Sequence, residues 1–153
     1  MQSKNIFKNP RFWSLVVFII ILVFGTKSWY INRAIDPTKD VEIIYAGKNG
    51  HGYIKNLDQY YAKVTKNIDQ AVARKDGIKP NDLKKIQQDQ HLSNKLNKQA
   101  KLYRSQVKNV SIKISKTTHL KNEDQIQLTV KTTLPNMPIK NIDQTVTVSG
   151  LKN

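Results

Sequence analysis

The chain has 153 residues, which leaves room for one ordinary domain and an additional segment. It contains no cysteine, so disulfides and thiolate metal sites are excluded. The formal net charge of +15 predicts attraction to an anionic partner, which is nucleic acid, a lipid surface or an acidic cell-wall polymer.

The first predicted element is apolar. Residues 12–31 supply about 20 mostly apolar positions, the length that a bilayer crossing requires. We predict an uncleaved transmembrane signal anchor at 12–31, after a basic cytoplasmic tail at 1–11 and before a linker at 32–40. A cleaved signal peptide, although no A-x-A site follows, and a buried core helix are the alternatives.

Topology follows from the flanks of this segment. Three basic residues precede the apolar run at 12–25 and three follow it, so the count alone does not decide the orientation. A short basic tail normally stays inside the cell. We therefore expect a single-pass protein of the cell membrane whose domain at 41–153 is extracellular.

The glycine-rich stretch GKNGHGY at 47–53 is predicted to be a hairpin. Apolar, β-branched residues precede it, a short strand follows it, and the Asn-Gly pair favours the positive φ angles of a tight turn. A phosphate-binding loop would carry its lysine at the end and lead into a helix. The predicted tip consists of Lys48, Asn49, Gly50 and His51.

Two helical regions come next. Apolar residues at helical spacing predict an amphipathic helix over 57–75, with Asn56 as its N-cap. A second helical region starts near Asn81 or Asp82 and changes its apolar face, which predicts a break at 89–93 with Ser93 as a cap.

The remaining chain alternates with a period of two, which predicts β-strands separated by turns at 120–124 and 134–138. The predicted fold class is α+β: an N-terminal transmembrane helix, then a small domain of antiparallel strands packed with one or two amphipathic helices. The alternating apolar residues are Val110, Ile112, Ile114, Ile126, Leu128, Val130, Val146 and Val148.

Three segments carry a family resemblance: VEIIYAGKNGHGYIK at 41–55, HLKNEDQIQLTV at 119–130 and TVTVSGL at 145–151. In this order they resemble a module of exported and membrane-anchored proteins of low-GC Gram-positive bacteria, with a V-x-V-x-F strand, a G-Y-N-G-Y-G-T-A hairpin and a closing T-V-x-V-S-G-L strand. Lys48 and His51 replace the usual tyrosines, and the zinc ribbon that often precedes the module is absent here. The resemblance implies an exported, membrane-tethered domain without catalytic residues.

Positive charge is concentrated in one region, because residues 77–121 hold 11 basic and 2 acidic residues. Most of the basic side chains are lysines, which suit diffuse attraction better than bidentate readout. We predict an anion-binding surface here, and a solvated face that only aids solubility is the alternative. This lysine-rich surface consists of Lys95, Lys98, Lys101, Arg104, Lys108, Lys113 and Lys116.

No constellation in the sequence supports catalysis, a cofactor or a metal. The three histidines lack a second ligand at metal-binding spacing, and Glu123 and Asp124 are adjacent in a predicted turn. We therefore predict that the protein is not an enzyme and that it uses no cofactor.

The predicted function is a membrane-anchored extracytoplasmic binding or scaffold protein that contacts teichoic acid or anionic lipid headgroups. One alternative is a cytoplasmic-facing, membrane-tethered nucleic-acid binder, which the lack of interleaved aromatic platforms and of a helix-turn-helix motif disfavours. Another is a small regulatory or immunity-type partner of a second membrane protein.

Overall fold

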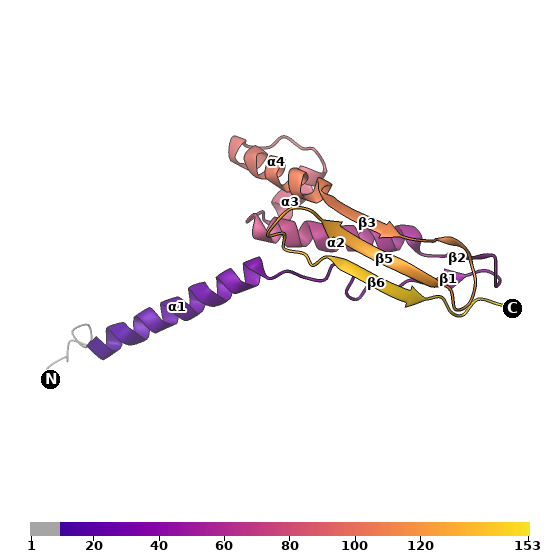
Figure 1. The fold of residues 1–153 in the computed structure, drawn as a ribbon. Coiled ribbons are helices and arrows are strands. Elements are labelled where there is room, and N and C mark those ends of the chain that lie inside the picture. Colours follow the sequence, from indigo (N-terminus) through magenta and orange to yellow (C-terminus); the bar gives the residue numbers. More distant parts are fainter. Residues whose placement is uncertain (1–9) are drawn as a thin grey trace. The chain divides into compact units, whose positions relative to one another are not determined.

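The computed structural model describes residues 10–153, and the chain divides into two units with the boundary between Arg33 and Ala34. The first unit contains the helix α1 (Pro10–Asn32), and the second contains the remaining helices and all the strands described below (Figure 1). Over the described residues the fold is α+β, with four helices and two small antiparallel sheets.

The predicted transmembrane helix is wrong. A bilayer crossing takes about 20 predominantly apolar residues. Among residues 10–153, no helix combines the length and the apolar character that such a crossing demands. The fold class therefore loses its membrane-spanning helix at 12–31, and the predicted single-pass membrane localisation with an extracellular domain is corrected with it. Residues 1–9 of the predicted basic tail lie outside the described residues.

The strands form two three-stranded sheets in which every neighbouring pair is antiparallel. One sheet has the order β1 (Tyr45–Ala46), β2 (Gly52–Ile54), β4 (Thr118–Leu120), and the other has the order β3 (Val110–Ile114), β5 (Gln125–Thr132), β6 (Ile142–Thr147).

Two isolated parallel bridges, Ile35 with Ile139 and Lys48 with Lys152, tie the chain around β1 to the chain around β6. Pro37 is fully buried. Residues 34–40, predicted as part of a linker, therefore pack into the folded domain.

The core lies between the helix α2 (Leu57–Lys75) and the sheets (Figure 1). The predicted helix over 57–75 is confirmed, and its apolar face is buried. Alternate residues of β5 face the same core, since Ile126, Leu128 and Val130 are at most 5% exposed. Each such side chain contributes about 1.5–3 kcal/mol when it leaves water. The buried apolar residues of α2 are Tyr60, Val64, Ile68, Ala71, Val72 and Ala73.

Two shorter helices follow, α3 (Pro80–Gln87) and α4 (Asn94–Lys108). The predicted break at 89–93 is confirmed, and Asp89 within it has a φ of 50°. Ser93 caps α4 as predicted, because its hydroxyl accepts a hydrogen bond from the Leu96 N–H at 3.4 Å. This cap fixes the start of the helix that carries most of the lysine-rich surface.

Asn56 stands at the N-cap position of α2 as predicted, but its side chain makes no capping hydrogen bond to the helix. Its side-chain amide instead accepts from the Ile44 N–H at 2.8 Å and donates to the Glu42 carbonyl at 3.0 Å. Asn56 therefore pairs with an extended backbone as a neighbouring strand residue would. The sequence carries no sign of this role, since the partners lie 12 and 14 residues away.

The hairpin predicted at 47–53 is confirmed, because β1 and β2 pair antiparallel on either side of it. Gly47 and Gly50 have φ angles of 101° and 89°, and the His51 N–H donates to the Lys48 carbonyl at 2.8 Å. Gly52 has a different reason to be glycine. A Cβ there would lie 2.5 Å from Leu151 Cδ1 and 3.0 Å from the Leu120 carbonyl oxygen.

We therefore expect Gly52→Ala to destabilise the domain by about 1–3 kcal/mol, because the added methyl group overpacks a closed contact. Urea unfolding followed by circular dichroism measures the change. His51→Ala, one residue away and exposed, should change the free energy of unfolding by less than about 0.5 kcal/mol. Equal effects of the two variants would contradict the close contact at Gly52.

Candidate functional site

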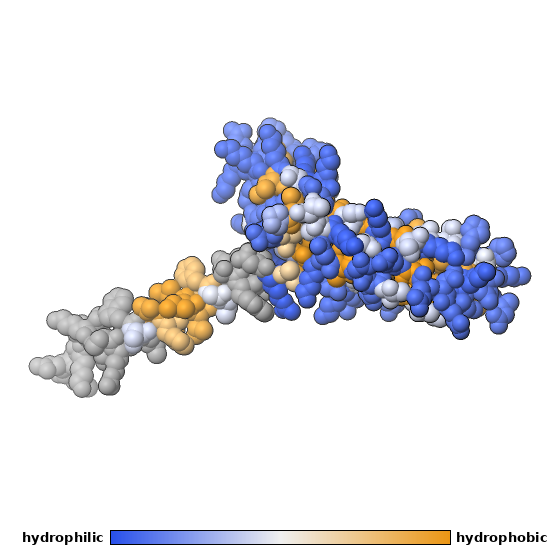
Figure 2. All heavy atoms as spheres, viewed as in Figure 1, coloured by the Kyte–Doolittle hydropathy of each residue, from blue (hydrophilic) through white to orange (hydrophobic). Residues whose placement is uncertain are grey.

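The helix α4 presents a basic face to solvent. At about 100° per residue, Lys95, Lys98, Lys101 and Lys108 fall within an arc of roughly 140°. All four are exposed, whereas Ala100 and Tyr103 on the opposite side are 1% and 5% exposed. The helix contains no acidic residue, so nothing within it neutralises this face. Figure 2 shows a predominantly hydrophilic surface over this part of the domain.

The structure divides the seven predicted residues into two groups. Arg104 forms an ion pair with Asp89 and donates to the Ile86 carbonyl at 2.9 Å, and Lys116 lies 2.8 Å from the Asp124 carboxylate. Both side chains are held by their own domain. In the described part of the chain, none of the other five forms an ion pair: Lys95, Lys98, Lys101, Lys108 and Lys113.

Sequence reasoning missed an apolar member of this surface. Leu102 follows Lys98 by four residues, which places it on the same exposed face, and its side chain is 53% exposed. The only sign of this in the sequence is that, around the helix, Leu102 lies between Lys98 and Lys95. On α3, Lys84 and Lys85 are also exposed and extend the basic region beyond α4.

Hydrogen bonds on the buried face of α4 hold the helix against the domain. The Tyr103 hydroxyl and the Gln87 amide both hydrogen-bond to the Asp69 carboxylate, the latter at 2.9 Å. One buried carboxylate on α2 therefore joins α3 and α4. Gln106 of α4 adds a second link, because its amide donates to both carboxylate oxygens of Asp76 at 3.1 and 2.9 Å.

Burial sets the protonation behaviour of this junction. Loss of solvent raises the pKa of Asp69 above its ordinary value, although the hydrogen bonds from Tyr103 and Gln87 oppose the rise. Burial, together with the Asp69 carboxylate, also raises the pKa of Tyr103. Tyr103 therefore stays protonated as a donor while Asp69 accepts.

The predicted hairpin tip is anchored to the domain rather than free. The Gly50 N–H donates to the Leu120 carbonyl at 2.9 Å, and Asn49 accepts from the Asn122 N–H at 3.0 Å. The side chains of Lys48 and His51 remain exposed. The turn at 120–124 that anchors the tip also holds Lys116 through Asp124, whereas no described contact links the tip to the lysines of α4.

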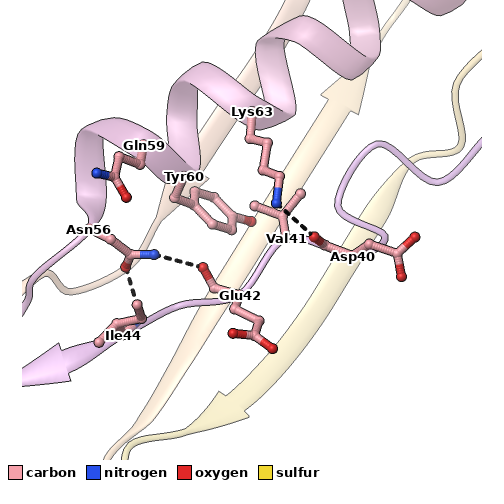
Figure 3. A pocket seen from close by; sticks show the side chains of 8 residues that line it. All are labelled: Asp40, Val41, Glu42, Ile44, Asn56, Gln59, Tyr60 and Lys63. Carbon is pink, nitrogen blue, oxygen red and sulfur yellow. Dashed lines mark hydrogen bonds between the residues drawn. The ribbon is translucent and has the colours of Figure 1, made fainter.

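A groove lies where residues 40–44 pass the first two turns of α2 (Figure 3). It has a volume of about 440 Å³, and Tyr60 at its base is only 1% exposed. The Lys63 ammonium donates to the Asp40 carbonyl at 3.2 Å across it. Residues 10–153 contain no group of three or more metal-ligating side chains close enough to hold an ion. The groove therefore offers a shallow polar cleft without assembled catalytic groups.

Comparison with known proteins finds no matching family model, no matching curated protein and no matching solved structure.

The raised pKa of Asp69 predicts a pH dependence of stability. The pKa of the Asp69 carboxyl is higher in the folded chain than its unfolded value of 3.8. The stability that this difference contributes is fully present below the unfolded pKa, and it is lost as the pH rises through the folded pKa. Asp69→Asn is neutral throughout, so its free energy of unfolding, relative to the natural chain, should increase from pH 3.5 to pH 7.5. Urea titrations across this range measure the difference.

Tyr103→Phe is the matched variant. It keeps the carboxylate and removes a hydrogen bond that lowers the pKa of Asp69, so the loss of stability with pH should extend over a wider range. A constant difference between Asp69→Asn and the natural chain at every pH would refute the assignment.

Proposed function

We propose that the lysine-rich surface binds a phosphate-bearing anionic polymer, such as teichoic acid, through electrostatic contact and without chemistry on the ligand. The observation that carries this is the acid-free helix α4, which exposes four lysines that have no carboxylate partner in the described chain. From Lys95 to Lys108 the helix rises by about 20 Å, long enough to meet several successive phosphates.

A bound polyanion relieves a cost that the free domain bears. Like charges that share a helix face repel one another, and here no acid within the helix offsets this repulsion. A polymer that lies along the face neutralises several lysines at once and releases its condensed counterions. Flexible lysine stems suit a polymer of irregular conformation, because they need no fixed bidentate geometry.

Nucleic acid is a weaker fit. The sole aromatic residue of α4, Tyr103, is 5% exposed and hydrogen-bonded to Asp69, so α4 offers no stacking platform for bases. Its one arginine, Arg104, is held by Asp89 and the Ile86 carbonyl. The helix therefore lacks a free guanidinium for guanine edges.

The test is charge reversal at Lys95, Lys98 and Lys101 together. We expect binding to purified teichoic acid to weaken at least about tenfold at low salt, and the natural chain to lose affinity steeply between about 50 and 200 mM salt. Fluorescence anisotropy with labelled polymer measures both.

The control is Lys39, Lys55 and Lys66 changed to glutamate, which alters the net charge equally at exposed positions outside α4. It should retain most of the affinity. If both triple variants lose the same affinity, overall charge and not the lysine-rich surface binds the polymer. Stronger binding of the natural chain to duplex DNA than to teichoic acid would favour the nucleic-acid alternative.

A further inference from the structure

The strand β3 is an open edge of its sheet. It pairs with β5 on one side and has no other strand neighbour in the described chain. The Ser115 N–H donates to Gln127, so the odd-numbered residues point their backbone groups toward β5. By alternation, Val110, Ile112 and Ile114 point theirs away from the sheet. Between residues 10 and 153, no backbone hydrogen bond outside β3 itself reaches these groups.

The opposite edge of the same sheet is different. Residues 41–45 run beside β6, and together with it they line a groove of about 330 Å³. The bridges Ile35–Ile139 and Lys48–Lys152 tie the two flanks together at both ends. A strand of a second copy could reach β6 only by displacing residues 41–45 of the first copy. The accessible edge for pairing is therefore β3.

This edge is complementary to itself. If two copies of β3 pair antiparallel around Ile112, Ile112 lies opposite its counterpart and Val110 lies opposite Ile114 of the second copy. Every residue whose backbone groups point away from β5 then lies opposite another such residue of the second copy. The backbone hydrogen bonds can therefore form along the whole strand without a register slip. The three half-buried apolar side chains meet on one face of the sheet, where β-branched cross-strand pairs are favourable.

The charges fit the same register. Lys113, the basic residue within β3, comes opposite Ser111 of the second copy, so the two Lys113 side chains do not oppose each other directly. Lys108 belongs to α4 and Lys116 follows the strand, so the register of β3 places neither of them opposite the other copy. Within β3 the pairing therefore places no lysine directly opposite another lysine.

We propose that the chain forms a two-fold symmetric dimer through antiparallel pairing of β3, which joins the two three-stranded sheets into one sheet of six strands. The contact is isologous, so it closes and does not grow into a filament. Five residues per copy bury less than a standard interface, so the dimer is weak and forms only at high protein concentration. This inference is independent of the proposed function, since no polymer takes part.

The first test changes one exposed residue at the edge of the full chain. Ser111→Asp places a carboxylate opposite the partner's Lys113 and should lower the dimer dissociation constant about three- to tenfold, whereas Ser111→Lys should raise it by a similar factor. Sedimentation velocity without polymer measures both. Thr145→Asp and Thr145→Lys, the same changes on β6, should leave dimerisation unaltered.

The second test locates the contact and uses the absence of cysteine in the chain. Residues 111 and 113 of opposite copies form a non-hydrogen-bonded pair, with Cα atoms about 4.5 Å apart, which is within disulfide reach. A mixture of Ser111→Cys and Lys113→Cys chains should therefore crosslink under mild oxidation faster than Ser111→Cys mixed with Thr145→Cys.

Two results would overturn the proposal. One is equal crosslinking of the two mixtures. The other is a sedimentation profile that does not change between Ser111→Asp and Ser111→Lys. Because all variants carry α1, any association through that helix cancels from both comparisons.

Discussion

The burial of one face of α2 is the constraint on which the rest of this fold depends. Tyr60, Val64 and Val72 are at most 1% exposed, so other parts of the chain cover them. β5 supplies part of the cover, and the segment at 41–45 packs near Tyr60. A β-sheet needs a buried hydrophobic face for stability, and packing against a helix supplies one. The helix gives both sheets a common surface.

The sequence was most informative where the physical signal is local. The period of 3.6 over 57–75 predicted α2 to the residue, and alternation predicted the strands around Ile112 and Ile126. Roles that depend on distant partners could not be read in this way. Asn56 occupies the N-cap position as predicted, yet its side-chain amide binds the backbone of Glu42 and Ile44, which only the fold brings near. The apolar run at 12–31 predicted a membrane span that the helices of the described chain do not support.

The same distinction applies to the lysine-rich surface. Helical spacing correctly predicted that Lys95, Lys98 and Lys101 share an exposed face, because that property belongs to α4 alone. The engagement of Arg104 with Asp89 and of Lys116 with Asp124 depends on the turns at 88–93 and 120–124. Those ion pairs reduce the available charge to five lysines. A count of basic residues therefore overstates what a ligand encounters.

The inner face of α4 explains how a helix with so little apolar surface stays in place. Tyr103 hydrogen-bonds to Asp69 of α2, and Gln106 hydrogen-bonds to Asp76, the C-cap residue that follows α2. These polar contacts hold α4 in place where leucines would commonly do so. A buried, hydrogen-bonded carboxylate fixes orientation more narrowly than an apolar contact, because its donors must align with two oxygens. Lateral repulsion among the exposed lysines tends to unwind the helix, and these directional contacts oppose it. The exposed lysines and the junction that holds the helix therefore lie on opposite faces of α4, and the contacts on the second face offset the repulsion on the first.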